Sequence, residues 1–201
     1  DTVTGAPVVI SGCTVRNYTN RFVYVSLSGK IESLTIDDCI FIGADNSTTN
    51  KAIYASSAHT QVETLSVTNS TFLNFNTGSN YFFRINCGEE LVLMPVVLID
   101  HCTFYNCYDR RGVYLYNAGR STIKNCISAF SERRDDTKSF TAYGDESIVK
   151  NVISYNVDLY GSAPKENIIS KNPLFVDAEN GNFQLYKDSP AVGAGDDGSE
   201  L

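Results

Sequence analysis

Short runs of alternating apolar and polar residues fill most of this chain, and each run is interrupted by one polar residue at a fixed place. The first copy is Val9-Ile10-Ser11-Gly12-Cys13-Thr14-Val15, and the last is Ser147-Ile148-Val149-Lys150-Asn151-Val152-Ile153-Ser154. Alternation with a period of two is typical of β-strands, whose successive side chains point to opposite faces. Each copy therefore predicts a short strand, a polar corner and a second short strand.

The copies recur at the interval of a solenoid coil. The residues that directly follow the corners mark the repeat: Cys13, Cys39, Ser70, Cys102, Cys126 and Val152. The steps between them are 26, 31, 32, 24 and 26 residues, within the range of about 20–45 residues for structural repeats. The sequence therefore predicts an all-β fold, a right-handed parallel β-helix, in which loops of unequal length leave the coils.

The corner positions hold residues suited to a sharp bend. They are Gly12, Asp38, Asn69, His101, Asn125 and Asn151. Glycine, asparagine and aspartate tolerate the left-handed backbone region, and stacked amide side chains can form a hydrogen-bonded ladder. Five further apolar segments are expected to form a third side of the coils: residues 22–27, 52–55, 81–85, 113–116 and 140–143.

Four of the six cysteines fall in the column that follows the corners. No CxxC pair occurs, and steps of 24 residues or more do not match a zinc site. We expect free thiols that pack as small apolar side chains. Disulfides remain an alternative, because Cys13 and Cys39, or Cys102 and Cys126, approach each other if their coils are adjacent.

The C-terminal part of the chain departs from the repeat. Residues 1–157 are expected to form the coils, and residues 158–201 a C-terminal cap of the same domain. Asn180-Gly181 is a hairpin-turn signal. The apolar residues on either side of this turn are expected to close the open end of the core, which a solenoid must cover: Leu174, Phe175, Val176, Phe183 and Leu185.

The motifs of this segment resemble those that end secreted bacterial β-helix proteins. Asn172-Pro173-Leu174-Phe175-Val176-Asp177 resembles a DPLFVD motif, Asn180-Gly181-Asn182-Phe183 an NGDF motif, and Gly193-Ala194-Gly195 ends a GSPAIDAG-like stretch. With its coils, the chain resembles the pectate-lyase-like β-helix domains of unknown function in Bacteroidetes surface proteins. The resemblance implies polysaccharide utilisation, an extracellular or outer-membrane location, and a longer multidomain lipoprotein. It supplies no catalytic motif.

Composition and charge narrow the classes of partner. Lys and Arg number 16 and Asp and Glu 23, a net charge of −7, which argues against nucleic-acid binding. No apolar run reaches 18 residues, so no membrane-spanning segment is expected, and an export signal is expected upstream. Residues 101–138 carry seven basic and four acidic side chains, 7 − 4 = +3. Such a local basic patch favours an anionic ligand.

Arginines and tyrosines in and near this patch are the candidate ligand-binding residues: Arg84, Tyr108, Arg110, Arg111, Tyr114, Tyr116, Arg133 and Arg134. Guanidinium forks match carboxylates and sulfates, and tyrosine rings can stack on sugars. The opposing interpretation is a solvated surface of mutually paired arginines and aspartates, with half of the tyrosines in the core. The leading hypothesis is a non-catalytic module that binds a polysaccharide, expected to be acidic.

Two rival hypotheses remain. The first is a polysaccharide lyase or glycoside hydrolase acting on uronate chains, with Arg111 or Arg133 as the base and Asp135 and Asp136 near a Ca²⁺ ion. The second is a structural spacer that binds no glycan.

The other chemically active candidates are expected to be structural. His59 and His101 are far apart in the pattern, which disfavours a Ser-His-Asp or metal-histidine site. Asp38 occupies a corner, and Asp196-Asp197 lies between glycines and is expected to be solvated. The leading hypothesis therefore assigns no catalytic residue, metal ligand or cofactor.

Overall fold

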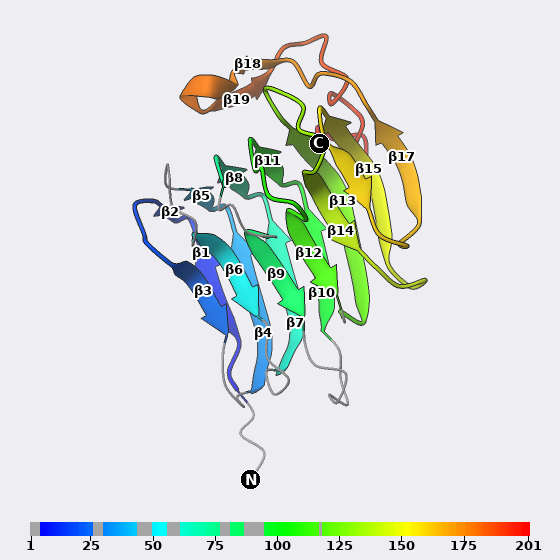
Figure 1. Ribbon diagram of the computed structural model, residues 1–201. Coiled ribbons are helices and arrows are strands. Elements are labelled where there is room, and N and C mark those ends of the chain that lie inside the picture. The colour runs from blue at the N-terminus through cyan, green and yellow to red at the C-terminus, as the bar shows by residue number, and fades with distance from the viewer. Residues whose placement is uncertain are drawn as a thin grey trace.

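The computed structural model is a coil of short parallel strands, which confirms the predicted fold class. The residues that it describes are 5–25, 30–43, 50–55, 61–76, 81–86, 95–116 and 118–201. Within these ranges every strand pairing between coils is parallel, and one hairpin near the C-terminus is antiparallel. The chain is therefore a parallel β-helix with an added C-terminal segment (Figure 1).

The strands of each coil stack on their counterparts in the neighbouring coils. The first strands are β1 (Val8–Ser11), β4 (Lys30–Asp37), β7 (Gln61–Thr68), β10 (Val96–Asp100), β13 (Arg120–Ala129), β15 (Ile148–Tyr155) and β17 (Lys165–Ile169). The second strands are β2 (Thr14–Val15), β5 (Ile40–Ile42), β8 (Thr71–Leu73) and β11 (Thr103–Tyr105). β13 and β15 run through the first corner and supply both strands of their coils.

The third strands form a separate sheet, the front layer of Figure 1. They are β3 (Arg21–Val25), β6 (Lys51–Ala55), β9 (Phe83–Asn86), β12 (Val113–Tyr116), β14 (Lys138–Ala142) and β16 (Asp158–Tyr160). The first five begin and end within two residues of the segments predicted for the third side. This sheet carries the outer face that the next subsection describes.

The predicted corners are confirmed by the backbone. All six corner residues have a positive φ, from 49° at His101 and Asn151 to 64° at Gly12. The expected ladder joins two of them, because Asn151 Nδ2 donates to Asn125 Oδ1 (3.4 Å). Asn125 Nδ2 also donates to Oδ1 of Asp100, the residue before the corner His101 (2.9 Å). A second series of left-handed asparagines, which the sequence analysis did not identify, follows the second strands: Asn17, Asn74, Asn106 and Asn156.

Aromatic rings stack from coil to coil inside the solenoid. The Phe72 ring centroid lies 5.0 Å from that of Phe41 and 4.9 Å from that of Phe104, with 7° between the planes of each pair. Phe140 meets Phe104 edge-on at 5.1 Å. All four rings are buried. Because such pairs stabilise beyond their buried area, the core fixes the alignment of successive coils.

The cysteine column consists of free thiols, as predicted. Cys39, Cys102 and Cys126 are buried, and burial raises the pKa of the Cys126 thiol, which keeps it protonated. Cys13 is exposed, contrary to the prediction that the whole column is buried. In the described part of the chain β2 pairs on one side only, with β5, so no coil covers Cys13 from the other side.

The C-terminal segment forms the predicted hairpin but packs on the flank of the coils. β18 (Phe175–Asp177) and β19 (Asn182–Leu185) pair around the 3₁₀ turn η1 (Ala178–Asn180). Phe175 and Phe183 pack with Tyr105, and their cluster includes apolar side chains from four successive coils: Leu73, Tyr105, Ile127, Ala129 and Ile153. Parallel pairing also continues through β16 and β17, past the predicted boundary at residue 157. The hairpin therefore covers the outer side of β8, β11, β13 and β15, and not the open end for which it was predicted (Figure 1).

The last residues are tied to the corner ladder by Asp196, which was expected to be solvated. Its carboxylate pairs with Lys124 Nζ (2.9 Å) and Lys150 Nζ (3.4 Å), and it accepts a hydrogen bond from Asn125 Nδ2 (2.9 Å). The hydrogen bond from Lys124 is the main reason that the pKa of this carboxyl lies well below its usual range. Asp196 is exposed, as expected, but its carboxylate is also ion-paired with two earlier coils, which the sequence pattern did not indicate.

Candidate ligand-binding face

A row of tyrosines crosses the outer face of the sheet that β3, β6, β9, β12, β14 and β16 form. Strand register places Tyr24 beside Tyr54, Tyr54 beside Arg84, and Arg84 beside Tyr114. Ring centroids are 5.7 Å apart between Tyr24 and Tyr54, 6.0 Å between Tyr54 and Tyr81, and 5.9 Å between Tyr81 and Tyr114. Because neighbouring strands lie about 4.8 Å apart, the row runs along the axis of the solenoid.

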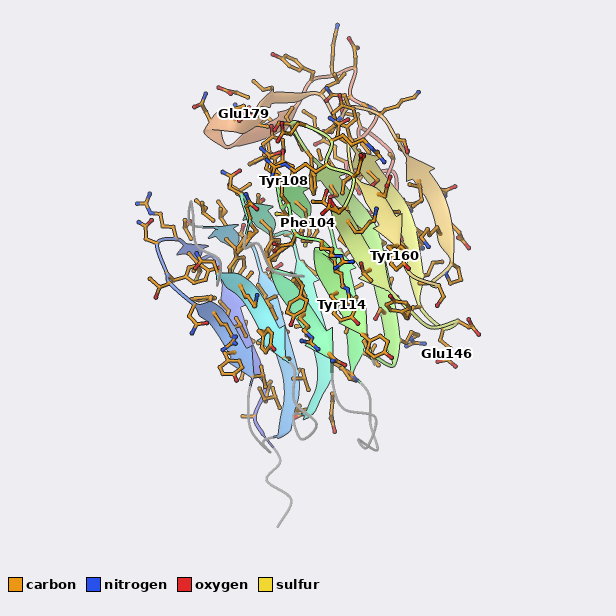
Figure 2. The ribbon with its side chains drawn as sticks, in the orientation of Figure 1. Phe104, Tyr108, Tyr114, Glu146, Tyr160 and Glu179 are labelled. Atoms are coloured by element: carbon orange, nitrogen blue, oxygen red, sulfur yellow. The ribbon has the colours of Figure 1, made fainter. Side chains whose placement is uncertain are left out.

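The row continues beyond Tyr114 into the later coils. Tyr116, on the same strand β12, stacks on Tyr114 at 5.8 Å, and Tyr143 of the next coil meets Tyr116 edge-on at 5.5 Å. Tyr160 of β16 lies on the same face, to the right of Tyr114 in Figure 2. We call these seven residues the tyrosine row: Tyr24, Tyr54, Tyr81, Tyr114, Tyr116, Tyr143 and Tyr160.

Cationic side chains lie on the rings of this row. Arg21 Cζ is 4.5 Å from the ring centroids of both Tyr24 and Tyr54, and Arg84 Cζ is 4.6 Å from that of Tyr81. Arg84 also donates a hydrogen bond to the Tyr81 hydroxyl. Guanidinium groups are attracted to ring faces, and such stacking orders them. The face therefore presents aromatic rings and positive charge in alternation.

Two hydroxyls of the row lie in surroundings that disfavour their ionised form. Burial raises the pKa of Tyr81 and of Tyr143. Lys51 lies 5.0 Å from the Tyr81 ring and donates to the Tyr81 carbonyl (3.1 Å), and burial lowers its pKa while the charge of Asp109 opposes that shift. Tyr81 and Tyr143 are therefore neutral hydrogen-bonding groups on a face that also carries cations.

A hollow of about 360 Å³ lies at the later end of the row. We call it the basic hollow, and its lining residues are Arg110, Arg111, Asp136, Lys138, Tyr143 and Tyr160. The loops after β11 and β13 thus emerge on the same side of the solenoid. Arg111 Cζ lies 4.7 Å from the Tyr114 ring centroid, which joins the hollow to the tyrosine row.

A glycine holds the first of these loops close to the coil that follows. Gly112 has a φ of 56°, and a Cβ atom there would lie 2.3 Å from the carbonyl oxygens of Lys138 and Ser139. Any larger residue would clash with this backbone as well as strain the left-handed conformation. The chain that carries Arg110 and Arg111 is therefore packed directly against β14.

The predicted binding residues divide into two groups. Arg84, Arg110, Arg111, Tyr114 and Tyr116 lie along the row or in the basic hollow. The other three are Tyr108, Arg133 and Arg134.

The side chains of the second group contact other residues nearby. Arg133 Nη2 donates to both carboxylate oxygens of Asp158 (3.0 and 2.9 Å), and Arg134 pairs with Glu132 (2.6 Å) while its Cζ covers the Tyr108 ring at 3.7 Å. The alternative prediction of a self-paired surface therefore describes Arg133 and Arg134. In Figure 2, Tyr108 lies towards the C-terminal segment, away from Tyr114.

The weaker catalytic candidates do not form a calcium site. The Asp135 side chain is fully exposed, and its carboxylate is 3.8 Å from Arg133 Nε. Asp136 lies in the basic hollow beside three cations. Calcium requires about six to eight oxygen ligands, and among the described residues no three His, Cys, Asp or Glu side chains converge on one point. The residues that are present do not fit this ion.

One hydrogen-bonded line has the composition of a hydrolase triad. His101 Nδ1 lies 2.8 Å from Asp100 Oδ1, and His101 Nε2 lies 3.0 Å from Ser199 Oγ. A triad serine must give its proton to the histidine, whereas Ser199 Oγ donates to the Glu200 carbonyl (3.2 Å). This contact therefore anchors the C-terminal segment on the corner ladder. The other histidine, His59, lies outside the described residues.

Much of the tyrosine row was not predicted from the sequence, although a signal for it exists. Tyr24, Tyr54, Arg84 and Tyr114 follow one another at steps of 30 residues, one position in each coil. A search for residues that recur at the same place in the third strands would have found them.

Comparisons with known proteins add one finding. Residues 1–75 match the sequence model of a domain of unknown function, DUF4957. The match covers β1 to β8 and includes the first two tyrosines of the row. It fits a β-helix domain of unknown function, and a search of curated proteins found no match to the chain. Within the described residues, no helix has the length and apolarity needed to cross a membrane.

Proposed function

We propose that this β-helix is a non-catalytic module that binds an acidic polysaccharide along the tyrosine row, at the surface of a bacterial cell. The observation that carries the proposal is the continuous line of rings and cations along the solenoid axis. A polysaccharide is itself a linear polymer, so a straight row can contact several of its sugars at once. The resemblance of the C-terminal motifs to secreted β-helix proteins supports the location.

The chemistry of the row suits sugar rings with acidic substituents. Aromatic faces pack on the apolar C–H faces of pyranoses, and phenol hydroxyls hydrogen-bond to sugar hydroxyls. Arg21, Arg84 and Arg111 are held at the rings, where their forks can receive carboxylates or sulfates. The strand spacing of about 4.8 Å is close to the length of one pyranose. Successive coils can therefore meet successive sugars without rearrangement, which lowers the entropic cost of binding.

Affinity electrophoresis tests this proposal. The purified domain is run through native gels that contain an acidic or a neutral polysaccharide. The variant is the double substitution Tyr24→Ala and Tyr160→Ala, because these row residues are 51% and 56% exposed and their removal leaves the core intact. The control is Tyr186→Ala, which removes an equally exposed tyrosine (54%) from the C-terminal segment.

We expect the acidic polymer to retard the wild type and the control, and to retard the double variant much less. Equal retardation of all three proteins would refute the assignment of the row. Release of unsaturated oligosaccharides in a parallel assay would instead support a lyase. A wild type that is neither retarded nor active would favour a structural spacer.

A further inference from the structure

We propose that the basic hollow is an anion site that receives one carboxylate or sulfate group of the polysaccharide. This inference rests on the proposed function and adds a defined position for the charged substituent. The hollow adjoins the row at Tyr143 and Tyr160, whose rings form part of its wall. An acidic sugar held there would fix the position of the whole chain along the row.

The charge of the hollow is not neutralised by its own lining. Arg110, Arg111 and Lys138 supply three positive charges and Asp136 one negative charge, 3 − 1 = +2. Lys138 Nζ also lies 3.3 Å from Asp158, but Asp158 is shared with Arg133, so these two further residues cancel each other. A hollow of net positive charge on an acidic protein favours an anion from solution.

Arg110 and Arg111 differ from the neighbouring arginines in having no carboxylate partner among the described residues. In the part of the chain that the structure describes, neither of them has a carboxylate within ion-pairing distance. Arg133 and Arg134, 23 positions further along in each case, are both paired with acidic side chains. Among these four arginines, the two in the hollow are therefore the ones available for bidentate bonds to an external acid.

The site is also preorganised. Arg111 stacks on Tyr114, and its carbonyl accepts a hydrogen bond from Thr141 Oγ1 (3.1 Å). The Lys138 N–H donates to the Asp109 carbonyl (3.3 Å), which joins the two loops that carry the cations. At Gly112 the first loop lies directly against β14, and a movement of this loop into solvent would break these hydrogen bonds. Arg111 therefore needs little ordering on binding, which increases its contribution to affinity.

The test compares two substitutions that remove the same charge. Arg110→Gln alters an exposed residue of the hollow, and Arg134→Gln alters a paired arginine outside it. Binding constants are measured by affinity electrophoresis with two matched pairs of polymers. Polygalacturonate is compared with its fully methyl-esterified form, and dextran sulfate with dextran, so that only the anionic group differs within each pair.

We expect Arg110→Gln to weaken binding of the acidic polymer about tenfold, the loss of charge-assisted hydrogen bonds from one guanidinium. Arg134→Gln should bind as the wild type does. A loss confined to polygalacturonate identifies a carboxylate as the occupant, and a loss confined to dextran sulfate identifies a sulfate. Equal affinities of the two variants, or equal binding of the charged and uncharged polymer by the wild type, would overturn the anion site. A wild type that binds none of the four polymers would overturn the proposed function as well.

Discussion

Replacement of Asn125 measures what the corner ladder contributes to the fold. Asn125 is fully buried at a corner with a φ of 50°. Its amide donates to Asp100 and Asp196, and its side-chain oxygen accepts from the Asp196 N–H (3.1 Å) and from Asn151. The residue therefore joins three coils and the C-terminal segment through one side chain.

Two separate effects lower the free energy of unfolding of Asn125→Ala. Partners left without a hydrogen bond in a buried place cost about 1–3 kcal/mol. An alanine in the left-handed backbone region, with no local hydrogen bond from its side chain, lowers the free energy of unfolding by about 1–2 kcal/mol more. The sum is about 2–5 kcal/mol. Asn125→Gly loses the same hydrogen bonds but fits the backbone, so it should be about 1 kcal/mol more stable than the alanine variant.

Urea unfolding followed by circular dichroism measures the free energy of unfolding of the wild type and of both Asn125 variants. Asn167→Ala is the matched control, because Asn167 has the same φ of 50° but is exposed and donates one ladder hydrogen bond, to Asn151 (3.0 Å). It should be destabilised less than Asn125→Ala. If the glycine variant at position 125 is no more stable than the alanine variant, backbone strain is not the reason for the corner residues. If both lie within about 0.5 kcal/mol of the wild type, the buried ladder does not stabilise the fold.

Three further outcomes follow from the packing and the ion pairs. Because Asp196 is held ionised in the folded chain, its stabilising effect is present above its unfolded pKa of about 3.9 and is lost as the pH falls below this value. The difference in melting temperature between the wild type and Asp196→Asn should therefore be larger at pH 6 than at pH 3. An equal difference at the two pH values would contradict this. Gly112→Ala should destabilise the fold by about 3 kcal/mol, the combined cost of overpacking and a left-handed backbone, measured by urea unfolding. In the native protein a thiol reagent should modify exposed Cys13 quickly and buried Cys126 only on unfolding; fast loss of both thiols would show that the coil opens readily.

The corners and strands could be predicted because each follows from a local preference repeated in every coil. A left-handed bend selects Gly12 or Asn125 by backbone sterics alone, and a period of two marks the strands on either side. The hairpin of the C-terminal segment was predictable for the same reason, since Gly181 adopts a φ of 80° at its turn. These features need no knowledge of which coil lies beside which.

The placement of this hairpin depends on contacts between distant segments and was predicted wrongly. Outward-facing apolar residues such as Leu73, Tyr105 and Ile153 leave a flank that requires a cover. Only the register of successive coils shows that these side chains lie next to one another, because they are about 30 or more residues apart in the sequence.

The same limit applies to the candidate site. Arg110 and Arg133 are both arginines in charged loops, and only Arg133 has an acidic partner. This partner is Asp158, which lies 25 residues beyond Arg133 in the next coil. A count of charges between residues 101 and 138 therefore gave the correct sign for the patch but could not tell the free arginines from the paired ones.

The ladder and the tyrosine row are two results of one geometric fact. In a parallel β-helix, residues at the same place in successive coils stack about 4.8 Å apart. At a corner this spacing lets Asn125 and Asn151 hydrogen-bond to each other, and on the third sheet it brings Tyr24 next to Tyr54. The first stacking is buried and stabilises the fold. The second is partly exposed, and stability alone does not require cations to be held on its rings, so it is the part of the molecule to which we assign the proposed binding of a linear, charged ligand.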